Sequence, residues 1–369
     1  MGAQCRSHCA PVFRKEYHME NIYPDYYRRF HCIGGECPDS CCIGWEIEID
    51  DEAMEKYKSA EGELGRRLRE NISDGCFVLN GERCPFLNEK NLCDIILDGG
   101  EDMLCTVCTE FPRFTQKIDK ATERGLGLAC PEAARIILSA DYFEEYTECL
   151  GGECPDSDYL TLKKARQYLY EIAQNNSYPL IKRLYALESA AAALQDCIDF
   201  DYDNFRDFVD EFEPADHFSD KSLEISYEKY HGYMKKVFDR YRGFEMINEG
   251  WFELLDRTEA VLEDDYEEKC RRFDRKNPIA EHYYEQMICS YIYRYFSKAY
   301  FDGDVYTKVM YGVFACLVVH ELDCGRYAEN GIFGLEESVD TVHLYSREIE
   351  YSQENLDMLA EAISEMVDM

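Results

Sequence analysis

The stretch HCIGGECPDSCC, residues 31–42, places four cysteines within eleven residues and decides how the first third of the chain is interpreted. Its heptapeptide GGECPDS occurs again at residues 151–157. In both copies one cysteine lies inside the heptapeptide and another lies five residues before it, namely Cys32 with Cys37 and Cys149 with Cys154. Only the first copy continues into Cys41 and Cys42, so we expect the two copies to serve different purposes.

The number of cysteines favours metal or redox chemistry in a reducing compartment. There are 19 among 369 residues, an odd count, and no positively charged, apolar leader opens the sequence, which argues against a secreted disulfide framework. A chain of this length can bury a core without disulfides. We therefore expect a cytoplasmic protein whose thiols are reduced.

The spacing within residues 32–42 is looser than that of an ordinary structural zinc site, which uses two pairs of ligands two to four residues apart. Adjacent side chains point in different directions, so Cys41 and Cys42 are not expected to hold one ion together. They suit either a multi-iron cluster or one ligand with a second thiol beside it. Buried free cysteines are the competing explanation.

Proline directly follows four cysteines, as it does in some iron–sulfur ligand runs: Cys37, Cys84, Cys130 and Cys154.

The remaining cysteines are expected to have structural roles. Cys149 and Cys154 lack a following Cys-Cys pair, and the second heptapeptide is predicted to lead into a helix that begins near Asp156. Five cysteines lie on helical patterns and are predicted to act as small apolar core residues: Cys197, Cys270, Cys289, Cys316 and Cys324.

Composition divides the chain into three regions and predicts an α+β protein that is mostly helical. Residues 1–20 form a polar leader that we expect to be mobile, and residues 21–154 form an irregular, cysteine-rich, cluster-binding domain. Residues 155–369 show helical periodicity and form an α-helical domain. An apolar and aromatic stripe at residues 283–296 is expected to pack in its core.

Local patterns predict several elements of the first domain. A polar, exposed helix is expected over residues 50–72, with glycines that weaken its continuity. A tight hairpin is expected at Asn80-Gly81. A further helix begins at Pro131, directly after Cys130, where the positive end of the helix favours a thiolate.

The charge and the missing motifs exclude several classes of function. A net charge of −35 argues against nucleic-acid binding and favours a basic partner, although acidity also serves solubility. The longest apolar run, residues 312–319, is too short to cross a membrane. The sequence lacks a Cys-x3-Cys-x2-Cys motif, a P-loop, a zinc-protease HExxH motif and a nucleophile elbow.

With these motifs in view, the sequence resembles the flagellin lysine-N-methylases. The resemblance is specific in YPDYYRRFHCIGGECPDSCCIGWEIEID (23–50), CPFLNEKNLCDI (84–95), CTEFPRF (108–114) and LACPEAAR (128–135). It continues more weakly in residues 291–304 and 345–356. This resemblance implies methyl transfer from S-adenosylmethionine to lysines of a protein substrate, flagellin in the family it resembles, and an iron–sulfur cluster, expected to be 4Fe-4S.

The resemblance also implies a set of metal ligands. They are the motif cysteines Cys32, Cys37, Cys41, Cys42, Cys84, Cys93, Cys108 and Cys130. Cys76 and Cys105 fall outside the family pattern. The sequence indicates neither a catalytic base nor a pocket for the methyl donor. The alternative function is a non-catalytic iron–sulfur or zinc module for sensing, transferring metal or carrying electrons.

Overall fold

The computed structural model describes residues 20–44, 47–149, 154–218, 227–247 and 250–366. The predicted mobile leader, residues 1–20, lies outside them except for Glu20, and so do Cys5 and Cys9. Most described residues are helical and a small sheet is present, so the predicted α+β, mostly helical class is confirmed.

A four-stranded sheet in the order β4-β5-β1-β6 joins distant parts of the first 149 residues. Its strands are β1 (Glu20–Pro24), β4 (Arg113–Ile118), β5 (Ala121–Leu126) and β6 (Glu145–Cys149). β1 lies between β5, with which it is parallel, and β6, with which it is antiparallel. The β4–β5 hairpin therefore returns the chain to the first strand after an excursion of nearly ninety residues.

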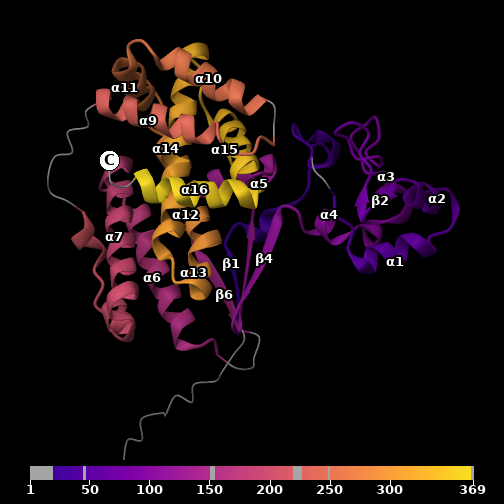
Figure 1. Ribbon diagram of the computed structural model, residues 1–369, viewed down its shortest axis with the longest axis horizontal. Helices are drawn as coiled ribbons and strands as arrows, with labels where there is room; N and C mark the ends of the chain where they lie inside the picture. The colour runs from indigo at the N-terminus through magenta and orange to yellow at the C-terminus, as the bar shows by residue number, and fades with distance from the viewer. Residues whose placement is uncertain (1–19, 45–46, 150–153, 219–226, 248–249, 367–369) are drawn as a thin grey trace, which may run out of the picture.

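That excursion forms a small lobe beside the main body (Figure 1). It contains α1 (Asp51–Ser59), α2 (Gly62–Glu70), β2 (Ile72–Ser73), β3 (Cys76–Phe77), α3 (Asp94–Gly99) and α4 (Thr106–Glu110). The lobe has its own buried cluster, in which Tyr57, Leu68 and Phe86 are fully covered. Because this cluster is small, side chains other than apolar ones must also stabilise the lobe.

The predicted helix over residues 50–72 is interrupted. Asp50 caps α1, accepting a hydrogen bond from the Ala53 N–H, and the chain then breaks before α2 at Gly62, whose φ of +74° requires glycine. The two short helices then fold against each other.

The hairpin of the lobe lies earlier than predicted. β2 and β3 pair through Asp74-Gly75, both with positive φ, as a two-residue turn between twisted strands requires. At the predicted position, Asn80 and Arg83 form an isolated bridge around Gly81 and the residue after it. A tight reversal therefore does occur next to Asn80, closed by two backbone hydrogen bonds between Asn80 and Arg83. The expected pairing of the segments on either side of it was wrong, because Cys76 and Phe77 pair with β2 instead.

The main body consists of helices packed on the sheet. They are α5 (Pro131–Leu138), α6 (Ser157–Ala173), α7 (Leu180–Asp201), α8 (Phe205–Asp210), α9 (Tyr227–Tyr241), α10 (Gly250–Leu262), α11 (Tyr266–Lys276), α12 (Ala280–Tyr295), α13 (Ala299–Asp302), α14 (Val305–Asn330), α15 (Leu335–Glu350) and α16 (Gln353–Met366). The predicted helix starts at Pro131 and near Asp156 are confirmed.

α12 and α14 run through the centre of the body (Figure 1). The predicted stripe on α12 is core packing, since Tyr284, Tyr291 and Tyr295 are almost fully buried. α14 is the one described helix that is long and apolar enough to cross a membrane, but 72% of its apolar window is buried inside the protein. This burial is that of a core helix.

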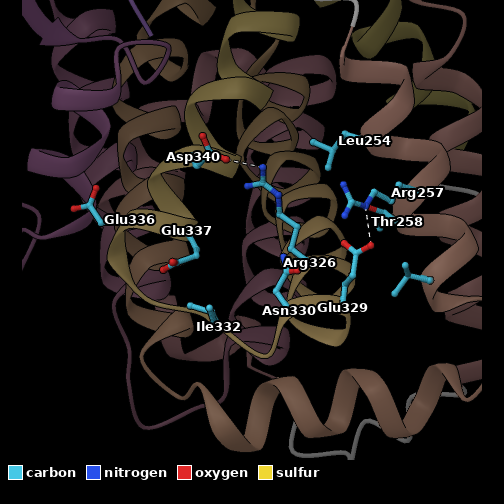
Figure 2. Close-up of a pocket in the computed structure, with 12 residues that line it drawn as sticks. Leu254, Arg257, Thr258, Arg326, Glu329, Asn330, Ile332, Glu336, Glu337 and Asp340 are labelled. Atoms are coloured by element: carbon cyan, nitrogen blue, oxygen red, sulfur yellow. Dashed lines mark hydrogen bonds and ion pairs between the residues drawn. The ribbon is translucent and has the colours of Figure 1, made fainter. Parts of the chain in front are cut away.

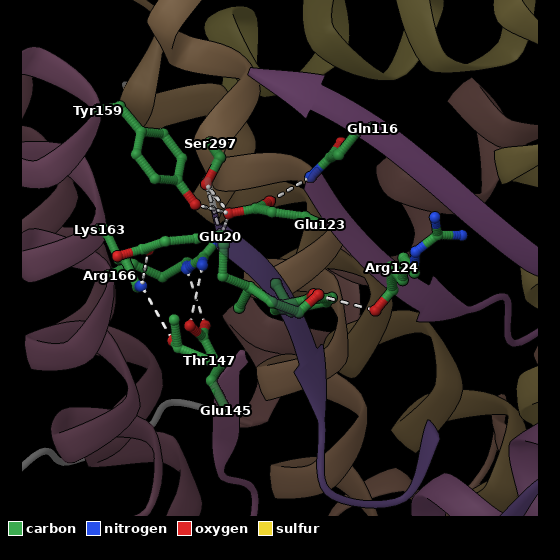
Figure 3. A network of polar contacts seen from close by, with 12 residues as sticks. Glu20, Gln116, Glu123, Arg124, Glu145, Thr147, Tyr159, Lys163, Arg166 and Ser297 are labelled. Carbon is green, nitrogen blue, oxygen red and sulfur yellow. Dashed lines mark hydrogen bonds and ion pairs between the residues drawn. The ribbon is translucent and has the colours of Figure 1, made fainter. Parts of the chain in front are cut away.

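Polar side chains join the sheet to the helices. Arg166 on α6 is fully buried between Glu123 of β5 and Glu145 of β6, at 2.7 and 2.8 Å (Figure 3). Tyr159 and Ser297 donate to the same Glu123 carboxylate. A buried charge must be paired in this way to be tolerated.

The two buried clusters divide the first predicted domain, which its composition did not indicate. Residues 20–30 and 113–143 contribute to the same core as the helices, through Ile22, Tyr26, Ile118 and Phe143. The second cluster is confined to residues between 47 and 105. The boundary near residue 154 stays a prediction, and the first of the expected domains contributes to both cores.

Candidate functional site

All eight predicted ligand cysteines are described, and they divide into two groups of four. The first thiol group, as we name it, contains Cys32, Cys37, Cys41 and Cys130. Cys32 and Cys41 are exposed, Cys37 is partly buried and Cys130 is buried. The group brings the 32–42 loop to the beginning of α5.

Helix geometry explains the position of Cys130. It is the N-cap of α5, so its thiol lies beside the backbone N–H groups of Glu132 and Ala133, which lower its pKa. Burial raises the pKa of Cys130 to about 11, and the nearby Cys37 and Cys32 thiols raise it further, whereas the backbone N–H groups oppose the shift. A positive centre would therefore be needed to hold these thiols as thiolates.

The second thiol group contains Cys42, Cys84, Cys93 and Cys108, all in the small lobe. The N–H of Cys84 donates to the carbonyl of Cys42 at 2.9 Å, and Cys93 forms a bridge with Leu87. Burial raises the pKa of Cys84 to about 12, and the Cys42 and Cys93 thiols add to this. The group thus lies against the small apolar cluster of the lobe.

The two groups meet at the Cys41-Cys42 pair. The Cys41 thiol donates to Cys42, which lowers the pKa of Cys42 to about 7 and raises that of Cys41. The neighbours of Cys41 are Cys32 and Cys130, whereas Cys42 neighbours Cys84, Cys93 and Cys108. Adjacent residues therefore belong to different groups.

Sequence reasoning missed Cys105. Its thiol accepts a hydrogen bond from Cys108, which lowers the pKa of Cys105 to about 7, and it is the N-cap of α4. The signal was present as the spacing Cys105-x2-Cys108, which is typical of metal and redox sites. Cys149, at the end of β6, and Cys154, before α6, come from the other copy of the heptapeptide and are among neither group's neighbours.

The donor set of each group fits a sulfur-ligated cluster, because four thiols are the usual ligands of a 4Fe-4S centre. Among the residues that the structure describes, however, no three His, Cys, Asp or Glu side chains are arranged to hold a single metal ion as they stand. The groups therefore fit a cluster in the type of their donor atoms and in which cysteines lie near one another. Closure of either group around a cluster would require adjustment of side chains in the loops.

Asp39 connects the first thiol group to the helical body. Its carboxylate accepts a hydrogen bond from Arg347 and lies 3.3 Å from Nε2 of His343, both on α15. Arg347 also donates to the carbonyl of Ile43 at 2.8 Å. Burial opposes ionisation of Asp39, but the hydrogen bonds from His343 and Arg347 outweigh it and lower its pKa. We call these three side chains the Asp39 clasp.

Behind Cys130 lies a second polar set from the body. Arg294 of α12 is 3.2 Å from Oε2 of Glu350, and Tyr295 donates to the same carboxylate at 2.8 Å. Burial raises the pKa of Tyr351, Arg294 lowers it and Cys130 raises it slightly. A Cβ on Gly127 would lie 2.5 Å from the hydroxyl of Tyr351, so a larger residue at this position would displace the tyrosine. The first thiol group is therefore backed by fixed polar side chains.

The helical body also contains cavities away from the thiol groups. One, of about 580 Å³, is a cleft between α10, α14 and α15 (Figure 2). Its two arginines are already paired, Arg257 with Glu329 and Arg326 with Asp340, and span the cleft walls. A smaller cavity, of about 300 Å³, lies among α7, α9, α11, α12 and α14 and is lined by tyrosines and aliphatic side chains.

Comparison with known sequences gives the family. The model of the FliB lysine N-methylase C-terminal domain matches residues 166–369, more than half of the chain. The chain belongs to the FliB lysine N-methylase family. The matched region includes both cavities and the α15 partners of Asp39, while all eight predicted ligands precede it.

Curated FliB relatives align over part of the chain. The lysine-N-methylase of Salmonella typhimurium is 31% identical over 127 residues, which cover 31% of this chain and 32% of that protein. The flagellar biosynthetic protein FliU of Salmonella muenchen is 30% identical over 130 residues, which cover 31% of this chain and 75% of FliU. The chain thus aligns with about a third of the length of the curated lysine-N-methylase. No solved structure matches.

Proposed function

We propose that this FliB-family chain is a protein lysine N-methyltransferase that uses S-adenosylmethionine and carries an iron–sulfur cluster. The observation that carries the proposal is the family match over residues 166–369. It is supported by curated relatives named lysine-N-methylase. We propose flagellin as the protein substrate, because another relative is a flagellar biosynthetic protein.

The acidic surface supports a lysine-bearing partner. A net charge of −35 attracts cationic segments over distances comparable to the screening length and repels phosphate backbones. Methyl transfer to an amine requires the neutral amine in line with the methyl group, so the site must remove a proton from the ammonium. We place the reaction in the cytoplasm, where thiols stay reduced.

We assign the cluster to the first thiol group. An iron–sulfur centre would supply electron transfer or coordination of the methyl donor there. Cys32, Cys37, Cys41 and Cys130 offer the four thiols, and the Asp39 clasp fixes the loop that carries three of them. The N-terminal end of α5 partly offsets the burial that raises the pKa of Cys130. The second thiol group offers a further four-thiol set, which we propose stabilises the small lobe with a metal.

Isothermal titration of S-adenosylmethionine into anaerobically purified protein tests the enzyme proposal against a non-catalytic metal module. We expect binding, and transfer of labelled methyl groups to flagellin but not to flagellin whose surface lysines are replaced by arginine. Absence of both binding and transfer in iron-loaded protein would leave the metal module as the better explanation.

The metal is tested separately. We expect brown protein that contains iron and acid-labile sulfide. Stoichiometric zinc without sulfide, in protein kept free of oxygen throughout, would refute the iron–sulfur assignment while leaving methyl transfer open to test.

A further inference from the structure

The smaller cavity of the helical body has the features of a ligand pocket. We name it the tyrosine pocket. It holds about 300 Å³, the lower end of the range for small-molecule sites, and five helices enclose it. Three tyrosines from two different helices contribute to its lining: Tyr227, Tyr230 and Tyr284.

The remaining walls are mostly aliphatic. Leu180, Ile181 and Leu184 project from the first turns of α7, and Leu317 faces them from α14. Such walls suit an unbranched hydrocarbon chain, because each methylene that it removes from water favours binding. A strongly polar ligand would leave these walls without matching contacts.

Charge is concentrated at two points of the lining. Asp274 and Glu281 are about half exposed, at 51% and 48%, so both carboxylates reach solvent while also lining the pocket. Asp274 lies 3.0 Å from His320, and Glu281 lies 3.0 Å from Arg183. Burial lowers the pKa of His320, but Asp274 outweighs it and raises the pKa to about 9.

The charges that touch the cavity therefore favour a cation. Asp274 pairs with His320, while Arg183 pairs with both Glu281 and the buried Glu285. With His320 protonated, these three carboxylates exceed the two cations by one negative charge. A tyrosine ring attracts a cation within about 6 Å of its centre; Arg271 already lies 4.7 Å from the centre of the Tyr227 ring, so this contribution comes from Tyr230 and Tyr284. The overall charge of the chain has the same sign.

The floor of the pocket is rigid. The Tyr284 hydroxyl donates to Asp323 at 2.8 Å, and Thr341 of α15 donates to the other oxygen of that carboxylate at 2.6 Å. Asp323 is almost fully buried and burial raises its pKa to about 7. A tyrosine fixed in this way loses little side-chain freedom when a ligand packs against it.

We propose that the tyrosine pocket binds an alkylammonium group, with the hydrocarbon chain between the aliphatic walls and the ammonium between the tyrosines and the carboxylates at the rim. This is the chemistry of a lysine side chain, and its identification with a substrate lysine rests on the proposed function. The binding site itself does not depend on methyl transfer.

The pocket is distinct from the thiol groups. Glu281 and Tyr284 lie near the beginning of α12, whereas Arg294, which neighbours the Tyr351 and Cys130 set, lies near its end. A helical rise of 1.5 Å per residue separates these positions by roughly 20 Å. An ammonium bound in the pocket therefore does not contact the proposed cluster ligands.

Methyl NMR on leucine- and isoleucine-labelled protein tests the proposal, with n-butylammonium as the probe and n-butanol as its neutral counterpart. We expect n-butylammonium to shift the Ile181, Leu184 and Leu317 methyl resonances and to bind at least several-fold more tightly than n-butanol. Equal affinity for the two probes, or shifts confined to residues outside the pocket, would overturn the proposal.

Two variants and one control locate the site. Glu281→Gln removes a half-exposed charge and should weaken n-butylammonium about fivefold, as expected for an exposed ion pair of about 1 kcal/mol, without affecting n-butanol. Leu317→Trp should block both probes. Asp340→Asn, in the other cleft, should change neither. If Leu317→Trp does not fold, Glu281→Gln still decides, and unchanged affinity for n-butylammonium in that variant contradicts the proposal.

Free lysine and a flagellin peptide distinguish the sources of the ammonium. A peptide that binds more tightly than its norleucine counterpart identifies a protein lysine, whereas binding of free lysine alone identifies a small-molecule amine. Butylammonium binding in protein that transfers no methyl group would refute the proposed function and retain the pocket.

Discussion

The same seven residues, GGECPDS, have two different structural roles in this chain. In the first copy Asp39 binds Arg347 and His343 of α15 and attaches the thiol loop to the helical body. In the second copy Asp156 caps α6, accepting the Tyr159 N–H at 2.9 Å, and also accepts the Tyr300 hydroxyl. The Asp39 carboxylate thus makes its contacts with a helix distant in the sequence, whereas the Asp156 carboxylate caps its own helix and makes one further contact, with Tyr300.

The difference teaches that a short motif has the role that its surroundings give it. Gly35 of the first copy lies against the 88–92 loop, where a Cβ would be 2.7 Å from the Lys90 carbonyl. The first copy thus contacts both the small lobe and α15. Three of the seven residues of the second heptapeptide lie outside the described residues, and its end enters a helix.

The largest expected effect is on the stability of the helical body and does not involve the small lobe. Burial raises the pKa of Asp323 to about 7, so between about pH 4 and pH 7 the folded state holds a proton that the unfolded state has lost, and stability falls as pH rises. Asp323→Asn removes this dependence. Between pH 4 and pH 7, the free energy of unfolding of the variant should rise by roughly 4 kcal/mol relative to that of wild type. Urea unfolding at several pH values measures this difference.

Asp264→Asn, at an exposed aspartate, is the control and should leave the pH dependence unchanged. Parallel stability curves for Asp323→Asn and wild type between pH 4 and pH 7 would show that Asp323 is ionised in the folded protein.

The next effect concerns the first copy. Asp39→Ala leaves Arg347 and His343 without this carboxylate although their side chains are only 7% and 4% exposed. Breaking a fully buried pair costs about 3 to 5 kcal/mol, and since Asp39 is 28% exposed we expect about 2 kcal/mol. A double-mutant cycle with Arg347→Ala measures the coupling free energy between Asp39 and Arg347. A value near zero would show that this contact does not hold the loop on the helical body.

The smallest effect concerns the second copy. Asp156→Ala removes an N-cap, which costs about 1 kcal/mol. Because the cap acts on the N–H groups of its own helix, hydrogen exchange should increase in the first turn of α6 and not in the 32–42 loop. Faster exchange in that loop, or a loss of stability as large as that of Asp39→Ala, would mean that the two copies are not as different as proposed.

Local chemistry predicted much of the fold. The α5 and α6 starts follow from Pro131 and Asp156, and the core stripe of α12 follows from its periodicity. The break before α2 was visible as the glycines that weakened the predicted helix. Where two turn signals competed, at Asp74-Gly75 and Asn80-Gly81, local preference alone could not decide which strands would pair.

Long-range contacts were beyond sequence reasoning. The spacing of the cysteines indicated a ligand site, but their division into two groups depends on how residues 32–42 meet α5 and the lobe. Asp39 and Arg347 are 308 positions apart, and no local pattern indicates their contact. Cys105 could have been found from its spacing to Cys108. The tyrosine pocket arises only when five helices pack, so no single segment carries its signature.

The iron content of two matched double variants tests the central claim most directly. Cys32→Ser with Cys37→Ser changes the first copy, and Cys149→Ser with Cys154→Ser makes the same changes in the second. Each lost thiolate opens a coordination position, so anaerobic preparations of the first variant should lose most iron and acid-labile sulfide per chain, whereas the second should keep the wild-type amounts. Equal loss in both variants would make the second copy a ligand segment as well, and equal retention would remove the cluster from the first thiol group; either result would contradict the account.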